Sequence, residues 1–403
     1  METGLEHCLV DSPATLRGRF GLLMNQASVD YQLRYACDLL AERFPGQLTA
    51  LFSPQHGLWG EEQANMIESP HSLYEPLGLP VYSLYSETRR PTAEMLRGIE
   101  CLVIDLQDVG TRVYTFVWTM QQCLIACAAA DLPVVVLDRP NPIGGRIAEG
   151  PLLESGFESF VGGATIPLRH GLTIGELALF LNAEQQIGAT LRVVPMEGWR
   201  RDRIWNITEG RNATEGVPYS GDGRTWVWPS PNMPRVSTAL LYPGQVLLEG
   251  TNLSEGRGTT LPFEVVGAPF IDPRQMLREL EPLALPGLAL RPIRFVPTFD
   301  KWQSQPCGGL ALHVVDPAAI RSVEMTLQIV AAVKRLWPAD FAWLPPPYEY
   351  EREKMPIDIL FGSSRLRQAL DSESPLQPAT IASLAQLDEA AWWRRVQPYL
   401  LYD

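Results

Sequence analysis

Residues 101–138 read CLVIDLQDVGTRVYTFVWTMQQCLIACAAADLPVVVLD, and this stretch decides the fold class. Its two ends, residues 101–106 and 133–138, are short apolar runs typical of buried strands. The segment between them, residues 114–130, has the length of a helix, and polar residues such as Gln121 argue against a membrane span. A strand, a helix and a strand in this order predict two parallel neighbours in one sheet.

The same alternation continues along the chain. Further strands are expected at residues 20–25, 48–53, 80–84 and 191–195, and helices at 31–44, 92–97 and 173–183. We therefore predict an α/β fold with a mostly parallel sheet and helices on both faces. A boundary near residues 262–273 divides the chain into a domain of residues 1–265 and a smaller C-terminal α/β domain of residues 266–403. The second domain is expected to contain a strand near 310–315 and helices near 323–336, 363–370 and 380–399.

Composition excludes several classes of protein. The 403 residues carry a net charge of −13, which argues against nucleic acid as a partner. The six cysteines form no CxxC pair, which favours free thiols in a reducing compartment. The N-terminus lacks the pattern of a signal peptide, so we expect a cytoplasmic protein that does not act at a membrane. No metal is expected because HExxH is absent and the histidines are far apart, and no GxGxxG or GxxxxGK[ST] phosphate loop occurs.

Polar residues follow the expected strands, where ligands bind in sheets of this kind. These residues are Asn25 and Gln26, Gln55 and His56, Asp105 and Asp108, and Asp138, Arg139 and Asn141. His56 is a candidate proton carrier or hydrogen-bond donor, and otherwise a residue that caps its loop. The acids Asp105 and Asp108 could divide into a proton donor and a charge stabiliser, whereas Asp108 could equally cap the following helix and pair with Arg112.

Three later segments also carry candidate ligand-binding residues. Residues 251–260, TNLSEGRGTT, form a polar loop between apolar runs, which favours a ligand site over a solvated loop. Arg169 precedes a helix that the capping box of Thr173 and Glu176 predicts. In WVWPSPNMP, residues 226–234, indoles beside Asn232 are suited to a sugar, although a tryptophan there could also be a hydrophobic plug.

The ordered motifs resemble one known family. They are SPQHG, VYSLY with TRRPT, DLQDVGTRVYT, LDRPNPI, EGP, PLRHGLTIGE, PSPNMP and EGTNLSEGRGTT, from about residue 21 to the C-terminus. Together they are similar to the NamZ family of exo-β-N-acetylmuramidases. The resemblance implies a Rossmann-like domain followed by a smaller auxiliary domain, with the site in a cleft between subdomains. It also implies hydrolysis of the β-1,4 bond that joins a terminal N-acetylmuramic acid (MurNAc) to N-acetylglucosamine (GlcNAc) in peptidoglycan fragments, without a cofactor, for cell-wall recycling.

The resemblance and the polar clusters together suggest the site residues. The expected catalytic residues are Gln55, His56, Glu62, Asp105 and Tyr114. The expected substrate-binding residues are Asp108, Arg112, Asp138, Arg139, Asn141, Glu149, Arg169, His170, Asn232, Glu249, Asn252, Glu255 and Arg257. Among them Arg112, Arg169 and Arg257 could bind the lactyl carboxylate of MurNAc.

One position departs from the family pattern. Relatives usually read Pro-Glu-His-Gly where this chain has Gln55, and the glutamate is expected to be a catalytic carboxylate. An amide cannot donate a proton at a useful pKa, whereas glycoside cleavage needs an acid. Either another acid, such as Glu61, Glu62 or Asp105, replaces it, or the protein binds MurNAc fragments with little or no turnover. A nucleotide-dependent transferase is a third hypothesis, which the missing phosphate loop disfavours.

Overall fold

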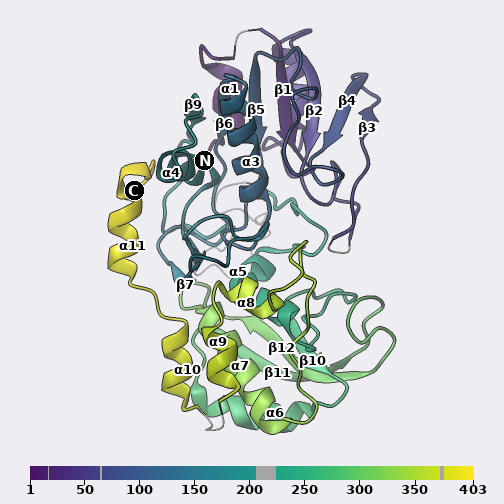
Figure 1. The fold of residues 1–403 in the computed structure, drawn as a ribbon, viewed down its shortest axis with the longest axis vertical. Coiled ribbons are helices and arrows are strands. Elements are labelled where there is room, and N and C mark those ends of the chain that lie inside the picture. The colour runs from purple at the N-terminus through teal and green to yellow at the C-terminus, as the bar shows by residue number, and fades with distance from the viewer. Residues whose placement is uncertain (17, 64–65, 206–223, 373–375) are drawn as a thin grey trace, which may run out of the picture.

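The computed structural model describes residues 1–403 except 17, 64–65, 206–223 and 373–375 (Figure 1). A seven-stranded sheet has the order β3-β4-β2-β1-β5-β6-β9. Its strands are β1 (Phe20–Met24), β2 (Leu48–Ser53), β3 (Ser72–Tyr74), β4 (Leu79–Ser83), β5 (Cys101–Asp105), β6 (Val134–Leu137) and β9 (Leu191–Val194). Neighbouring strands are parallel except β3, which is antiparallel to β4. The predicted α/β class with a mostly parallel, Rossmann-like sheet is confirmed.

Helices cover both faces of this sheet. Leu22 of β1 belongs to an apolar cluster shared with α1 (Gly4–Val10) and α2 (Ala36–Arg43). The next residue, Leu23, belongs to a second cluster on the opposite face, shared with α3 (Phe116–Ala129) and α4 (Ile174–Glu184). Because consecutive side chains of a strand point to opposite faces, both faces are buried, and this explains why the strands are apolar throughout.

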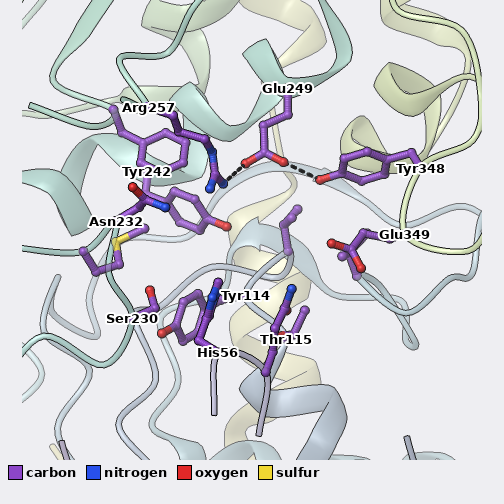
Figure 2. Close-up of a pocket in the computed structure, with 15 residues that line it drawn as sticks. His56, Tyr114, Thr115, Ser230, Asn232, Tyr242, Glu249, Arg257, Tyr348 and Glu349 are labelled. Carbon is purple, nitrogen blue, oxygen red and sulfur yellow. Dashed lines mark hydrogen bonds and ion pairs between the residues drawn. The ribbon is translucent and has the colours of Figure 1, made fainter. Parts of the chain in front are cut away.

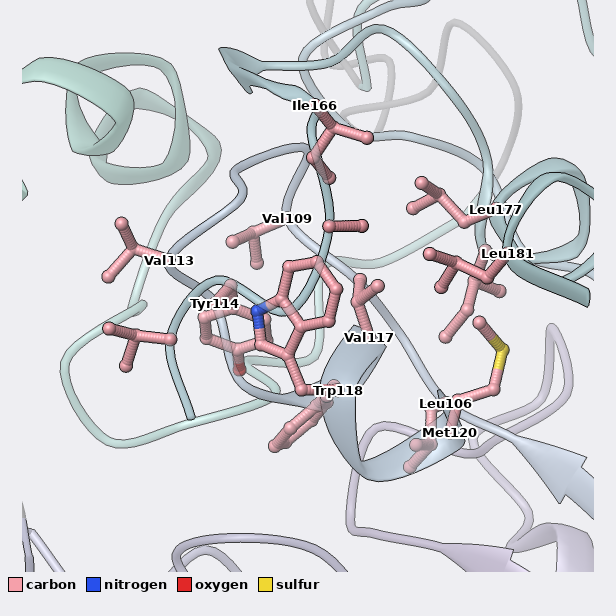
Figure 3. Close-up of a cluster of buried hydrophobic side chains, with 14 of the residues drawn as sticks. Leu106, Val109, Val113, Tyr114, Val117, Trp118, Met120, Ile166, Leu177 and Leu181 are labelled. Carbon is pink, nitrogen blue, oxygen red and sulfur yellow. The ribbon is translucent and has the colours of Figure 1, made fainter. Parts of the chain in front are cut away.

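The core beside α3 also positions the loop that precedes this helix. Trp118 is buried between Val109, Ile166 and α4 (Figure 3). Its indole Nε1 donates a hydrogen bond to the backbone oxygen of Arg112 at 2.8 Å. The loop that carries residues 113–115 is therefore tied to the core by a buried donor, which limits its movement.

The C-terminal part of the molecule contains a separate antiparallel sheet, β10-β12-β11. Its strands and the surrounding helices are β10 (Val265–Ala268), β11 (Leu288–Phe295), β12 (Cys307–Val314), α5 (Val236–Gln245), α6 (Pro273–Leu280), α7 (Ser322–Leu336), α8 (Pro356–Phe361), α9 (Arg365–Leu370) and α10 (Pro378–Leu384). Three 3-10 segments also occur, η1 (Val246–Gly250), η2 (Glu281–Leu283) and η3 (Gln397–Tyr399). A small sheet of β7 (Glu149–Leu152) and β8 (Pro167–Arg169) lies between this part and the large sheet (Figure 1).

The two parts exchange segments across the expected domain boundary. Helix α5, which precedes residue 265, packs against α7 of the C-terminal part. Helix α11 (Glu389–Val396) returns to the large-sheet domain, where Trp392 packs edge-on against Phe180 of α4 (Figure 1). The division at residue 265 stays a prediction.

Three expected helices differ from the structure for local reasons. Residues 93–98 form turns in place of the helix expected at 92–97, because nucleating a helix is costly for so short a segment. The helix expected from residue 31 begins at Ala36, since the Asp30 carboxylate accepts the backbone N–H groups of residues 32 and 34 and holds a loop. The helix expected at 380–399 is divided into α10 and α11, and Asp388 caps the second one.

Candidate active site

A partly enclosed pocket lies between the loops of the large sheet and the C-terminal part (Figure 2). Its empty volume is about 420 Å³. The lining residues are Gln55, His56, Val113, Tyr114, Thr115, Val161, Ser230, Asn232, Met233, Tyr242, Glu249, Arg257, Phe263, Tyr348 and Glu349. Six of them, Gln55, His56, Tyr114, Asn232, Glu249 and Arg257, are expected site residues from distant parts of the chain.

His56 enters the pocket as a neutral hydrogen-bond acceptor. Its Nδ1 lies 2.6 Å from the backbone oxygen of Glu62. A carbonyl oxygen can only accept, so Nδ1 carries the proton and Nε2 is left as an acceptor. Burial lowers the pKa of His56 to about 4, which keeps the ring uncharged at neutral pH. The ring therefore presents an acceptor, and no N–H donor, at Nε2, which suits a sugar hydroxyl, while its part in catalysis stays a prediction.

Gln55 is buried and both ends of its amide are used. Its Oε1 accepts a hydrogen bond from the Thr115 hydroxyl at 2.7 Å. Its amide also bonds the Glu349 carboxyl. Since this bond lowers the pKa of Glu349, it stabilises the carboxylate, and the donor is the amide N–H. Gln55 therefore joins the start of α3 to a carboxyl group in the same pocket.

Aromatic and amide side chains form one wall of the pocket. Tyr114 packs against Tyr242 edge-on, with ring centroids 6.2 Å apart. The Tyr114 hydroxyl lies beside Ser230 (Figure 2). Asn232 donates from Nδ2 to the backbone oxygen of Gln63 at 2.9 Å, which leaves its side-chain oxygen as an acceptor. This wall combines apolar ring faces with hydroxyl and amide groups, as a sugar requires.

A buried charge network adjoins this wall. Arg257 Nη2 lies 2.6 Å from Glu249 Oε1, and its Nε lies 3.1 Å from Glu255 Oε1. Lys301 pairs with the other oxygen of Glu255 at 2.6 Å. The Tyr348 hydroxyl donates to Glu249 Oε2 at 2.6 Å (Figure 2). Although burial opposes the charge, these two carboxylates hold the pKa of Arg257 above its usual value, so the guanidinium stays charged.

Glu349 is the second carboxyl group in the pocket, and it is not among the site residues expected from the sequence. The residue is only 4 % exposed, and its Oε2 accepts a hydrogen bond from the Tyr85 hydroxyl at 3.0 Å. Burial raises the pKa of Glu349 to about 7, with Glu249 adding to the rise. A carboxyl group with this pKa is protonated in a substantial fraction of molecules near neutral pH, as a general acid must be.

Asp105 and Arg139 are placed together but outside the pocket. Arg139 binds both oxygens of Asp105, at 2.5 and 2.7 Å, and the pair is buried at the ends of β5 and β6. In the same region the Asn25 amide binds the backbone oxygen of Pro229. The protein chain itself therefore fills the crevice between β1 and β5, where the strand order reverses. Asp105 and Arg139 consequently do not line the pocket.

Asp138, Asn141, Asp108 and His170 connect loops instead of lining the pocket. Asp138 accepts hydrogen bonds from the Thr173 and Tyr402 hydroxyls and from the backbone of Gly175, and Asn141 binds residues 143 and 172. Asp108 accepts from the backbone of Gly110 and lies 3.4 Å from Nε2 of His170. These contacts hold the start of α4 and the C-terminal tail against the sheet.

The remaining expected residues also bond mainly to the protein. The Arg112 guanidinium donates to three backbone oxygens, and that of Arg169 to two. Glu149 accepts from the backbone of Glu324, and Asn252 binds residues 340 and 342. The backbone oxygen of Glu62 accepts the hydrogen bond from His56. The Glu255 carboxylate pairs with Arg257. The Glu61 carboxylate accepts a hydrogen bond from the backbone N–H of Trp59. The structure does not bring Arg112 or Arg169 to the pocket.

Nine lining residues were missed in the sequence, and five of them carry polar groups: Thr115, Ser230, Tyr242, Tyr348 and Glu349. The signal for the last two was LPPPYEYE, residues 344–351, where prolines precede two tyrosine–glutamate pairs. Glu349 and Tyr350 have positive φ angles of 43° and 70°, which non-glycine residues rarely adopt. Such strained positions occur at functional sites more often than elsewhere.

Two further searches concern metals and membranes. Among the described residues, one group of three side chains is close enough together to bind a metal ion. It consists of Glu2, His7 and Glu197, and it lies outside the pocket lining. Within the same residues, every helix is too short or too polar to cross a lipid bilayer.

Comparison with known proteins defines the class of this fold and site. Models of the exo-β-N-acetylmuramidase NamZ family match residues 20–237 with their N-terminal domain and residues 240–402 with their C-terminal domain. The chain therefore belongs to the NamZ family.

Individual relatives agree with this assignment. The peptidoglycan β-N-acetylmuramidase NamZ of Bacillus subtilis (strain 168) is 44 % identical over 345 residues, which cover 85 % of this chain and 80 % of the relative. Two crystal structures of DUF1343 family proteins from Bacteroides fragilis are similar in fold, with TM-scores of 0.84 and 0.74 at 32 % and 26 % identity. Each alignment covers 100 % of this chain and 99 % of the other.

Proposed function

We propose that this protein is an exo-β-N-acetylmuramidase that hydrolyses the β-1,4 bond between a terminal MurNAc, at the non-reducing end, and GlcNAc in peptidoglycan fragments. The observation that carries the proposal is the partly enclosed pocket of a NamZ family member, with the carboxyl groups of Glu249 and Glu349 on its walls. Glycoside hydrolysis uses two carboxyl groups around the scissile bond, and an enclosed pocket admits one terminal sugar.

The pocket chemistry is suited to an acidic amino sugar. Arg257 Nη1 has no hydrogen-bond partner among the described residues, although the guanidinium is paired through its other nitrogens. This N–H is available to the lactyl carboxylate of MurNAc. His56 Nε2 and the Asn232 side-chain oxygen can accept from the sugar hydroxyl and N-acetyl N–H groups. Tyr114 and Tyr242 supply ring faces for the apolar C–H surface of the sugar.

The alternative of a binding protein without turnover is not favoured. Its motivation was Gln55, which cannot act as an acid. The pocket holds two other carboxyl groups, Glu249 and Glu349, so the substitution does not remove acids from the site. The relative from Bacillus subtilis, at 44 % identity, is named as a muramidase.

We also propose that the reaction serves cell-wall recycling in a reducing, cytoplasmic compartment. All six cysteines are buried and form no disulfide bonds, although Cys123 and Cys127 lie one helical turn apart on α3. Free buried thiols are typical of proteins from reducing compartments.

The test compares substrates that differ in the terminal sugar and in the order of the two sugars. The purified protein should release the chromophore from an aryl β-MurNAc glycoside and leave the aryl β-GlcNAc glycoside intact. It should also cleave the MurNAc–GlcNAc disaccharide, but not GlcNAc–MurNAc, in which MurNAc is at the reducing end. Absence of release from every MurNAc substrate would refute the proposed function.

A further inference from the structure

A second, open hollow adjoins the pocket. This outer groove has an empty volume of about 810 Å³, and its lining includes Arg89, Phe160, Tyr350 and Glu351. Glu349 lines both the pocket and the outer groove. Glu349 therefore stands at the junction between the more enclosed pocket and the more open outer groove.

Contacts from both sides hold Glu349 at this junction. Tyr85, whose ring packs against Phe160 and Tyr350 of the groove, donates to Oε2, and Gln55, which lines the pocket, donates to the same carboxyl group. The Tyr85 ring is covered by the Arg89 guanidinium, 4.1 Å above its centroid, and Arg89 also lies 4.4 Å from the Tyr350 ring centroid. In Figure 2 the Glu349 side chain points toward the interior of the pocket, on the same side as Tyr348.

We propose, on the basis of the proposed function, that Glu349 is the proton donor to the leaving oxygen and that the outer groove holds the departing GlcNAc. In an exo-acting enzyme the scissile bond lies where the pocket opens, because the sugar before the bond is inside and the sugar after it is outside. Glu349 occupies this boundary. Gln55, at the position of the expected family glutamate, orients Glu349 through its amide instead of donating a proton.

The proposed step balances as a hydrolysis. The Glu349 carboxylic acid gives its proton to the glycosidic oxygen while the bond from C1 of MurNAc to this oxygen breaks, and the electron pair leaves with GlcNAc. Water adds its hydroxyl group to C1 and loses a proton to the Glu249 carboxylate. Proton exchange with solvent then restores both groups.

The surroundings of Glu349 favour its acid form at neutral pH. Burial raises its pKa to about 7, and the nearby Glu249 carboxylate acts in the same direction, whereas the Tyr85 and Gln55 donors and Arg257 lower it. The charged and titratable groups on the groove side are Glu68, Glu87, Arg89, Tyr350 and Glu351.

The outer groove has the surface that a neutral sugar requires. Tyr350 is 50 % exposed, and Phe160 and the Arg89 guanidinium plane lie beside it. These flat faces can stack on the apolar face of GlcNAc, while the carboxylates and Arg89 at the edge can bind its hydroxyl groups.

The experiment compares two leaving groups in the Glu349→Gln variant. A para-nitrophenyl leaving group departs as a stable anion and needs little protonation, whereas GlcNAc needs a full proton. Loss of a general acid costs about 100-fold to 10,000-fold. We therefore expect kcat/KM for MurNAc–GlcNAc to fall by at least about 100-fold, and that for para-nitrophenyl β-MurNAc by less than about tenfold. The control Glu94→Gln, at an exposed glutamate outside the pocket and the groove, should leave both values unchanged.

Other outcomes separate the proposals. Equal losses on both substrates would refute the role of Glu349 as proton donor while leaving the muramidase assignment intact. A wild-type protein inactive on both substrates would instead refute the proposed function. If Glu349→Gln does not fold, the wild-type pH profile decides. The kcat/KM for MurNAc–GlcNAc should fall above about pH 7, and a profile flat to about pH 9 would overturn the inference.

Arg89→Ala should raise KM for the disaccharide alone, and equal effects on both substrates would refute the groove assignment.

Discussion

Replacement of Arg257 by methionine tests the buried charge network directly. Arg257 bridges Glu249 and Glu255, and all three side chains are nearly inaccessible to solvent. Removing one partner of a buried ion pair costs about 3–5 kcal/mol, because it leaves an uncompensated charge. Here Glu255 keeps Lys301 and Glu249 keeps the Tyr348 hydroxyl, each at 2.6 Å. We therefore expect a loss near the lower end, about 3 kcal/mol in the free energy of unfolding.

Chemical denaturation followed by tryptophan fluorescence measures this loss, and Arg395→Met is the matched control. Arg395 pairs with Glu184 on the surface, at 2.7 Å and partly exposed, so its replacement should cost less than about 1 kcal/mol. The double variant Arg257→Met with Glu249→Gln should lose less than the sum of the single variants, because it removes the stranded charge. An Arg257→Met protein within about 1 kcal/mol of the wild type would refute the reasoning.

The same Arg257→Met protein should bind MurNAc about 10-fold to 150-fold more weakly, since one hydrogen bond between charged groups contributes about 1.5–3 kcal/mol. Calorimetry measures this, and unchanged affinity counts against Nη1 as a ligand group.

Three other predictions concern single groups. His56→Asn should raise KM about threefold to tenfold in steady-state kinetics, because it removes one neutral acceptor while asparagine tolerates the φ of 74°; an unchanged KM would contradict this. Gln55→Glu should move the fall in kcat/KM to higher pH, since two carboxyl groups sharing a site raise one pKa; an unmoved profile would be inconsistent. Burial raises the pKa of Glu149 to about 7, so the folded state holds this proton more tightly than the unfolded state, and stability is lost as pH rises from about 4.5 to about 7. Glu149→Gln should therefore lose less stability than the wild type between about pH 5 and pH 8 in denaturant titrations, and equal losses would refute this.

The local pattern of apolar residues was enough to predict most strands of the large sheet. The strands at β1, β2, β4, β5, β6 and β9 lie within a residue or two of their expected positions, because apolar runs of strand length alternate with helices whose termini carry capping residues. The Thr173 capping box, for example, was predicted and is present at the start of α4. The C-terminal antiparallel sheet was harder to predict from the sequence, because exposed positions alternate with half-buried ones along β11.

Part of the pocket could also be read from the sequence. Gln55, His56, Tyr114, Asn232, Glu249 and Arg257 occur in motifs where polar groups follow strands or stand between apolar runs, and the structure brings them together. Asp105, Arg112 and Arg169 occur in the same kinds of motif, but they bond to a neighbouring side chain or to backbone oxygens. A charged residue in a polar motif can serve either purpose, because burial requires it to find partners in both cases.

The sequence by itself determined the fold class, the family and the fact that loops at one edge of the sheet carry polar chemistry. Only the tertiary structure decided which polar groups face the pocket and which are satisfied elsewhere. Glu349 shows the reason. Its role depends on Tyr85 and Gln55, which lie more than 260 residues away along the chain. The desolvation that raises its pKa arises only when these distant segments pack around it.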